Sequence, residues 1–379
     1  MLQAETLPAI FQGRITPDNE GCYLYARSFS PTVAHLARQL ATMEGTEDAY
    51  CCASGMAAIS SALLNVCNAG DWIVASRAVY GGTHALLRDF LPHKCNINTL
   101  FVDITDIEAV KSALLSSKAK VLYAETLSNP TLVVADVPEL AAVAHDAGAC
   151  FVIDNTFTPM ILSPALLGAD VVVHSLTKFI SGAADVVAGV VCGSKRFVSS
   201  LMNLTTGPLM LLGPVLDPQV AAQLSLRLPH LPLRIQEHSR RAEALARRLE
   251  QLGAKVTYPG LRNHPQHQLL SSMANCGMYG FGGIFTIEFE TSDQANAFME
   301  SLQNEQKSAL MAVSLGYFDS LVSASGASTS SELSEDEKKG AGIRAGLVRL
   351  SVGLTGTLEE RVQEIEAAWR ATTVLASSF

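Results

Sequence analysis

Between residues 32 and 222, short apolar runs rich in β-branched residues alternate with segments of helical periodicity. Parallel strands need helical crossover connections and are buried on both faces, so this alternation is typical of a mostly parallel sheet wrapped by helices. The sequence therefore predicts an α/β fold whose large domain contains a mostly parallel seven-stranded sheet. The seven predicted strands cover residues 49–53, 72–75, 99–102, 121–124, 151–153, 171–173 and 186–191.

The remaining sequence predicts a second, smaller domain. At 379 residues the chain exceeds the size at which a single core keeps growing. Residues 236–252 keep helical spacing and stop at Gly253, so they predict a connector helix. Two further strand–helix pairs follow, and they predict an α+β domain with an open-faced sheet; their strands cover 283–290 and 347–352, and their helices begin at Ser292 and Thr357.

Three parts of the chain are thus expected: an N-terminal arm over residues 1–31, a large domain over 32–222, and a connector helix with a C-terminal domain over 223–379. The arm has proline punctuation and no amphipathic period, so it is expected to be extended and to lean on another surface. Residues 323–339 are rich in Ser, Glu and Lys, and this composition predicts a flexible loop.

Composition excludes several classes of partner. A net charge of −9 without a dense basic stripe argues against nucleic acid as a binding partner. The sequence contains no run of 18 apolar residues, so no membrane span is expected. Eight cysteines lie scattered without a C-x-x-C pair, which favours reduced thiols and a cytoplasmic location. No metal site is expected, because His264 and His267 flank a proline without a third ligand nearby. A dinucleotide-binding G-x-G-x-x-G turn is also absent from the sequence.

A carboxylate and a lysine follow two successive apolar runs of the predicted sheet. Asp154 ends the first run, and Lys178 follows the second 24 residues later. Pyridoxal phosphate (PLP) needs an amine for its aldehyde and an acidic partner for its ring nitrogen, and these two residues suit those roles. Ser175 and Thr177 flank the lysine and could hydrogen-bond a phosphate. The spacing therefore predicts a PLP site at the end of the sheet.

Many short motifs, in order along nearly the whole chain, resemble the Cys/Met-metabolism family of PLP enzymes. Within it, the chain is most similar to the plant-type methionine γ-lyases, through residues 81–86, 209–214 and 328–333. The resemblance implies an aspartate-aminotransferase-like fold of type I. The motifs are Tyr25-Ala-Arg27, Pro31-Thr32, Ser54-Gly-Met56, Tyr80-Gly-Gly82, Glu125-Thr126, Asn129-Pro130, Asp154-Asn-Thr156, Ser175-Leu-Thr-Lys178, Ser181-Gly182, Val313-Ser-Leu-Gly316 and Gly346-Leu-Val-Arg-Leu-Ser-Val-Gly353.

The resemblance implies roles for the residues that surround the cofactor ring. Lys178 would bind the cofactor and shuttle protons, Asp154 would pair with the ring nitrogen, and Tyr80 would stack on the ring near the leaving sulfur. Asn129 would hydrogen-bond the 3-oxygen of the ring.

Further residues are implied at the phosphate. Gly55 and Met56, at a helix N-terminus, would offer backbone N–H groups to it, with hydroxyls from Ser175 and Thr177. Residues equivalent to Tyr25 and Arg27 reach a neighbouring subunit's phosphate in this family. A homotetramer built as a dimer of dimers with shared sites is therefore expected.

The implied substrate is an amino acid whose α-carboxylate Arg349 grips with help from Ser314. An arginine in such an apolar context is costly unless paired, although alternation alone would also allow it to face outward. Val313 and Gly82 would make the distal pocket apolar and without an anionic group, whereas cystathionine γ-lyases carry a glutamate where this chain has Val313.

The expected reaction is α,γ-elimination of L-methionine to methanethiol, 2-oxobutanoate and ammonia. A cystathionine γ-lyase and a γ-synthase of the same family are the alternatives, and a PLP-binding scaffold without catalysis is a third. The sequence alone does not rank methionine, homocysteine, cysteine and cystathionine as substrates.

Overall fold

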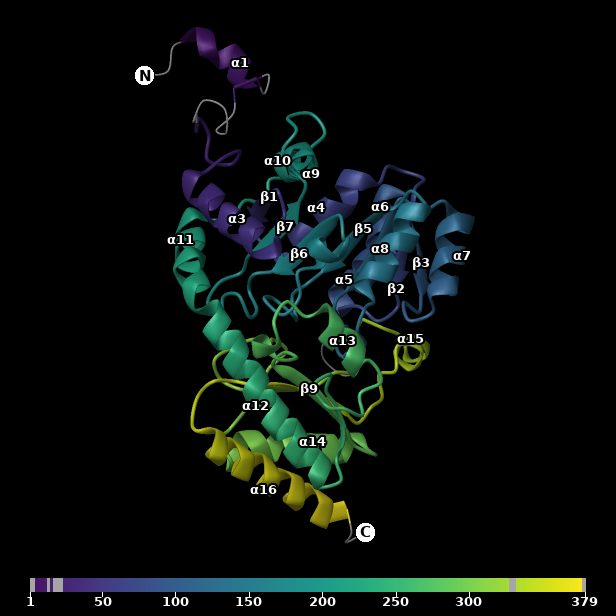
Figure 1. The fold of residues 1–379 in the computed structure, drawn as a ribbon, viewed down its shortest axis with the longest axis vertical. Helices are drawn as coiled ribbons and strands as arrows, with labels where there is room; N and C mark the ends of the chain where they lie inside the picture. The colour runs from purple at the N-terminus through teal and green to yellow at the C-terminus, as the bar shows by residue number, and fades with distance from the viewer. Residues whose placement is uncertain (1–3, 12–13, 16–22, 327–331, 377–379) are drawn as a thin grey trace.

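The computed structural model describes residues 4–11, 14–15, 23–326 and 332–376. A larger upper part and a smaller lower part are connected by the long helix α12 (Figure 1). Within the described part of the chain, every helix is too short or too polar to cross a lipid bilayer.

The upper part contains the predicted seven-stranded sheet, with strand order β1-β7-β6-β5-β4-β2-β3. Only β7 runs against its neighbours, so the prediction of a mostly parallel sheet is confirmed. The strands are β1 (Asp48–Cys52), β2 (Trp72–Ser76), β3 (Asn98–Val102), β4 (Val121–Glu125), β5 (Cys150–Asp154), β6 (Val171–Ser175) and β7 (Gly189–Gly193).

The last strand begins later than predicted, at Gly189 instead of residue 186. The backbone of Ala188 bonds the hydroxyl of Thr177, which accepts from Ala188 N at 3.1 Å and donates to Ala188 O at 3.3 Å. The backbone N–H and C=O of Ala188 are therefore bonded to the Thr177 side chain instead of a neighbouring strand, and β7 begins at the next residue.

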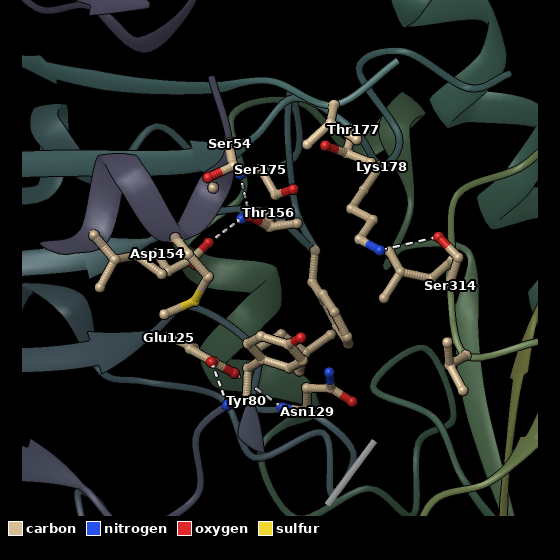
Figure 2. Close-up of a pocket in the computed structure, with 18 of the residues that line it drawn as sticks. Ser54, Tyr80, Glu125, Asn129, Asp154, Thr156, Ser175, Thr177, Lys178 and Ser314 are labelled. Carbon is tan, nitrogen blue, oxygen red and sulfur yellow. Dashed lines mark hydrogen bonds between the residues drawn. The ribbon is translucent and has the colours of Figure 1, made fainter. Parts of the chain in front are cut away.

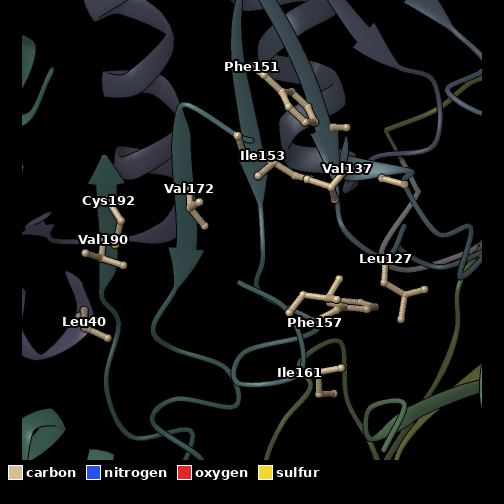
Figure 3. Packing of buried hydrophobic residues seen from close by; sticks show 14 of the residues in the cluster. Leu40, Leu127, Val137, Phe151, Ile153, Phe157, Ile161, Val172, Val190 and Cys192 are labelled. Atoms are coloured by element: carbon tan, nitrogen blue, oxygen red, sulfur yellow. The ribbon is translucent and has the colours of Figure 1, made fainter. Parts of the chain in front are cut away.

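Helices cover both faces of this sheet, which explains why its strands are apolar at successive positions. Phe151 and Ile153 pack into one buried cluster (Figure 3), whereas Val152, between them, packs into another. The first cluster includes residues of α3 (Pro31–Glu44), α7 (Ile107–Ser117), α8 (Val137–Asp146) and α11 (Pro218–Arg227). The second includes residues of α4 (Gly55–Val66), α6 (Leu91–Cys95), α9 (Lys195–Leu201) and α10 (Pro208–Leu212).

The lower part is built on a five-stranded sheet of order β10-β11-β12-β9-β8. A separate buried cluster joins this sheet to three helices. The strands are β8 (Lys255–Thr257), β9 (Ile284–Glu288), β10 (Leu310–Met311), β11 (Leu321–Ala324) and β12 (Leu347–Ser351), and the helices are α12 (Leu231–Gln251), α14 (Ser292–Glu300) and α16 (Leu358–Ala376). The predicted connector helix is confirmed, with a start at Leu231, and Gly253 after it adopts a φ of +86°. The domain limits at residues 31 and 222 stay predictions.

The prediction of an open-faced sheet is wrong. All five residues of β12 are buried, and so are four of the five residues of β9. Ile284 of β9 belongs to the core cluster of the large domain. The face that the sequence pattern leaves polar is therefore covered by the large domain instead of solvent.

Two segments expected to be irregular contain regular structure. Residues 323–339 include the end of β11 and the helix α15 (Glu335–Gly340), which begins with a capping box between Ser334 and Glu337. The N-terminal arm contains a short helix, α1 (Leu7–Phe11), so it is not extended throughout. Residues 1–3, 12–13, 16–22 and 327–331 lie outside the described residues.

Candidate active site

A cavity of about 540 Å³ lies where β4, β5 and β6 end, and it also receives side chains from the lower part of the molecule. It brings together eleven of the fourteen predicted site residues. These are Gly55, Met56, Tyr80, Asn129, Asp154, Ser175, Thr177, Lys178, Val313, Ser314 and Arg349; Tyr25, Arg27 and Gly82 do not line it. Residues far apart in the sequence thus meet at the carboxyl edge of the parallel strands, where ligands of open α/β sheets bind.

Lys178 lies in the turn after β6 and points into the cavity (Figure 2). Its Nζ donates to Ser314 Oγ at 2.9 Å. Burial, and then the positive charge of Arg349, lowers the pKa of Lys178 to about 8. An amine of this kind is uncharged in a useful fraction near neutral pH, as an attack on an aldehyde requires.

Asp154 ends β5 on the opposite side of the cavity (Figure 2). Its Oδ1 accepts from the backbone N–H of Thr156 at 2.8 Å, and Thr156 Oγ1 in turn accepts from the backbone N–H of Ser175 at 2.8 Å. Burial raises the pKa of Asp154, and within the described residues its carboxylate forms no ion pair. A cation that enters the cavity would stabilise this carboxylate.

Backbone N–H groups at the N-terminus of α4 face the same cavity. The side chain of Ser54 caps this helix by accepting from Ala57 N at 3.0 Å, and Gly55 follows as its first residue. A Cβ at Gly55 would lie 2.7 Å from the Cβ of Ser175, so only glycine permits this close approach. The free N–H groups of the first turn and the nearby hydroxyl of Ser175 form a cradle suited to an anion.

The hydroxyl of Thr177 is less available than the sequence suggests. It donates to Ala188 O, so it must turn its hydrogen away from that carbonyl to bond a phosphate.

Glu125 is a cavity residue whose role the sequence reasoning missed. It ends β4, is almost fully buried, and binds two backbone donors: Tyr80 N reaches its Oε1 at 2.6 Å, and Asn129 N reaches its Oε2 at 3.0 Å. Burial, and then the charge of Asp154, raises the pKa of Glu125 to about 8. The signal was present in the sequence, because Glu125 ends its apolar run as Asp154 ends the next one.

Arg349 is only 1% exposed, so the outward-facing alternative is wrong. Its guanidinium donates to Asn129 Oδ1 at 2.9 Å and to the backbone oxygens of Val313 and Ser314 at 3.3 and 3.0 Å. Its Nε has no partner among the described residues. Burial lowers the pKa of Arg349 to about 10, which leaves it charged at neutral pH. Because its partners are all neutral oxygens, its charge is free to bind a carboxylate.

Tyr80 covers the outer side of the cavity, and 41% of its surface is exposed. Burial, and then the charges of Glu332 and Glu125, raises the pKa of Tyr80, which keeps its hydroxyl protonated. Gly82 lies under this ring, since a Cβ there would meet Tyr80 Cε1 at 2.7 Å. The expectation of a distal region without an anionic group is wrong, because Glu332 lines the cavity together with Val313.

Tyr25 and Arg27 lie away from the cavity of their own chain. Arg27 Nη1 donates to the backbone oxygen of Met210 at 2.6 Å, and its guanidinium lies 5.3 Å from the centre of the Tyr25 ring. Tyr25 is 60% exposed. These two residues are therefore presented on the surface beside α10.

The donor set suits a phosphorylated pyridine aldehyde such as PLP. Lys178 offers an amine of lowered pKa, Asp154 a half-buried carboxylate that forms no ion pair with any described residue, and α4 an anion cradle. The described residues contain no group of three or more His, Cys, Asp or Glu side chains that could hold a metal ion.

Comparisons with known proteins agree with this geometry. The profile of the family described as Cys/Met metabolism PLP-dependent enzyme matches residues 7–369. A methionine gamma-lyase from Arabidopsis thaliana is 54% identical over 369 residues, which cover 97% of this chain and 83% of that protein.

Two solved structures are similar over nearly the whole chain. A cystathionine gamma synthase from Xanthomonas oryzae pv. oryzae, in complex with cystathionine, superposes with a TM-score of 0.87 at 31% identity and covers 94% of this chain and 89% of its own. A structure from Campylobacter jejuni that contains N′-pyridoxyl-lysine-5′-monophosphate superposes with a TM-score of 0.89 at 28% identity. The match covers 98% of this chain and 92% of that one. These likenesses confirm the predicted fold type.

Proposed function

Because the chain belongs to the Cys/Met metabolism family of PLP-dependent enzymes, we propose that it catalyses α,γ-elimination of L-methionine. One methionine and one water would give methanethiol, 2-oxobutanoate and ammonia. The observation that carries the proposal is the cavity itself, which holds a depressed-pKa lysine, a half-buried carboxylate and a charged arginine at one end of the sheet. The 54% identity to a methionine gamma-lyase supports this choice of substrate.

The chain's residues divide the work of binding. Asp154 would pair with the ring nitrogen of the cofactor, and the first turn of α4 with Ser175 would bind its phosphate. Asn129 would donate from its amide to the 3-oxygen of the ring, since its Oδ1 already accepts from Arg349. Arg349 would bind the α-carboxylate of the amino acid bidentately. The carbonyl oxygens of Val313 and Ser314, which accept from Arg349, hold the plane of its guanidinium in place.

Proton transfer falls to Lys178 and Tyr80. When bound, PLP supplies an electron sink for the charge that develops at Cα. Lys178 would hold the cofactor, and its amine would remove the protons at Cα and Cβ of the amino acid. Ser314 accepts from Lys178 Nζ and so keeps the amine aimed into the cavity. Tyr80, whose hydroxyl stays protonated, donates a proton to the departing sulfur.

Product analysis with purified holoenzyme tests this function. Methionine should give methanethiol, 2-oxobutanoate and ammonia in equal amounts, and homocysteine, cysteine and cystathionine should be compared under the same conditions. Added cysteine separates lyase from synthase, because a γ-synthase would divert methionine or an activated homoserine into cystathionine. Measurable ammonia release from any of the four amino acids would rule out the PLP-binding scaffold.

We infer in addition that the sites are shared between chains of a dimer of dimers. Tyr25 and Arg27 are held together at the surface, beside the exposed Leu211 and Leu212 of α10, and cannot serve the cavity of their own chain. A second copy docked on this face would place them at its phosphate cradle. A cytoplasmic location also stays a prediction.

A further inference from the structure

Glu332 lines the active-site cavity in the company of Tyr80 and Val313. Burial, and then the charge of Glu332, raises the pKa of Tyr80, and both side chains line the same cavity. Val313 is 66% exposed, and Glu332 is exposed as well, so this group lies at the opening. The opening of the cavity therefore carries a negative charge.

The backbone around Glu332 is fixed by three contacts. Arg88 Nη2 donates to the carbonyl oxygen of Glu332 at 3.2 Å, and Arg88 Nη1 binds Glu337 of α15 at 2.7 Å. The neighbouring Leu333 is 5% exposed, which anchors the chain on that side. Ser334 then begins α15 with its capping box. Glu332 is thus presented at a defined place.

The Glu332 carboxylate has no hydrogen bond or ion pair with any described residue, although two acidic neighbours in sequence are paired. Glu335 binds Lys338, and Glu337 binds Arg88. An unpaired carboxylate that lines a cavity together with an apolar side chain such as Val313 attracts a cation more strongly than one surrounded by water alone.

We propose that Glu332 recognises a positive charge at the distal end of an amino-acid substrate. Arg349 binds the α-carboxylate deep in the cavity, so a substrate chain that extends outward passes Val313 and reaches Glu332. At this position a side chain that ends in an ammonium or guanidinium gains a weak ion pair that an uncharged side chain of the same length lacks. This inference rests on the proposed function, since it uses the same cavity and the same carboxylate anchor.

A binding experiment with two unreactive amino acids tests the idea separately from turnover. L-Norleucine has no γ-leaving group and ends in a methyl, whereas L-lysine carries an ammonium on the same four-carbon chain. Dissociation constants of both are measured by calorimetry with the holoenzyme, Glu332→Gln and Asp336→Asn. Asp336 is exposed on the first turn of α15 and does not line the cavity, so it is the matched control for loss of one negative charge.

Glu332→Gln should weaken lysine about threefold while norleucine binding stays unchanged, which is the size expected of a partly exposed ion pair. The difference should shrink at high ionic strength. Asp336→Asn should leave both dissociation constants as in the wild type. An unchanged lysine-to-norleucine ratio in Glu332→Gln, or an equal change in Asp336→Asn, overturns the proposal. Because neither amino acid is eliminated, failure of methionine turnover is a separate result.

Discussion

The floor and the mouth of the cavity are built in different ways. The floor, formed by Glu125, Asp154, Ser175 and Lys178, consists of residues at or just after the ends of three parallel strands, and Thr156 links Asp154 to Ser175 through two hydrogen bonds. The mouth, formed by Val313, Glu332 and Tyr80, comes from irregular segments and is exposed. The more enclosed floor alters pKa values and so serves the reaction chemistry, whereas the exposed mouth contributes weaker interactions that select among substrates.

Removing the amine of the floor should have the largest effect. Lys178→Ala is expected to lower elimination by about 10³-fold or more, because covalent attachment of the cofactor and proton transfer are lost together. The visible absorption of the lysine-linked cofactor should disappear as well. Lys195→Ala, on the exposed start of α9, is the control and should behave as the wild type. Near-normal turnover of Lys178→Ala would remove this residue from the mechanism.

A smaller loss of activity should follow from replacing Glu125, whose carboxylate accepts hydrogen bonds from Tyr80 N and Asn129 N. Glutamine offers one acceptor oxygen, so in Glu125→Gln one of the two N–H donors, from Tyr80 or Asn129, faces an NH₂ group. We expect kcat/KM for methionine to fall about 30-fold, mostly in kcat, because Tyr80 and Asn129 are no longer held in the orientation that the reaction needs. Cofactor content should stay unchanged, as in the exposed control Glu139→Gln on α8. If Glu125→Gln lowers the thermal stability of the protein but leaves kcat/KM unchanged, Glu125 has only a structural role.

A change at the mouth should alter selectivity and leave the chemistry intact. Val313→Glu adds a second carboxylate near Glu332, so kcat/KM for cystathionine should rise about tenfold relative to methionine. The control Val313→Leu keeps the site apolar and should leave the ratio near its wild-type value. Equal changes for both substrates would show that the mouth does not discriminate between distal groups.

Mixing two inactive variants tests whether the floor is completed by another chain. With equal amounts of Arg27→Ala and Lys178→Ala, half of the dimers are hybrids with one intact site, which predicts about one quarter of wild-type activity. Replacing Arg27→Ala in the mixture with the double variant Arg27→Ala/Lys178→Ala should abolish this recovery. Activity no higher than that of Arg27→Ala alone, or an active monomer, contradicts shared sites.

Sequence periodicity was enough to predict the large sheet and, on the floor, Asp154, Ser175 and Lys178, whereas the role of Glu125 was missed. Residues that end parallel strands must lie at one edge, so Asp154 and Lys178 could be placed together before any contact was known. The covered face of the second sheet was missed, because alternation in β9 reports only that one face is more polar than the other. Docking of the two parts, which buries Ile284, depends on contacts between distant segments.

The mouth was the least predictable region for a similar reason. Glu332 lies in a Ser- and Glu-rich stretch whose composition predicts a loop and does not distinguish one carboxylate from another. Its position depends on the hydrogen bond that Arg88, 244 residues earlier in the sequence, donates to its carbonyl oxygen. The burial of the neighbouring Leu333 fixes the chain on the other side. The close packing of Gly82 beneath Tyr80 is likewise a tertiary contact that spacing cannot reveal.

The measurement that tests the account most directly is kcat/KM of the wild-type holoenzyme for L-methionine and L-cystathionine, followed through 2-oxobutanoate. The apolar Val313 at the mouth, with Glu332 as a weak partly exposed charge, predicts a higher value for methionine. A higher value for cystathionine would contradict the assignment, and the cystathionine lyase would then replace it.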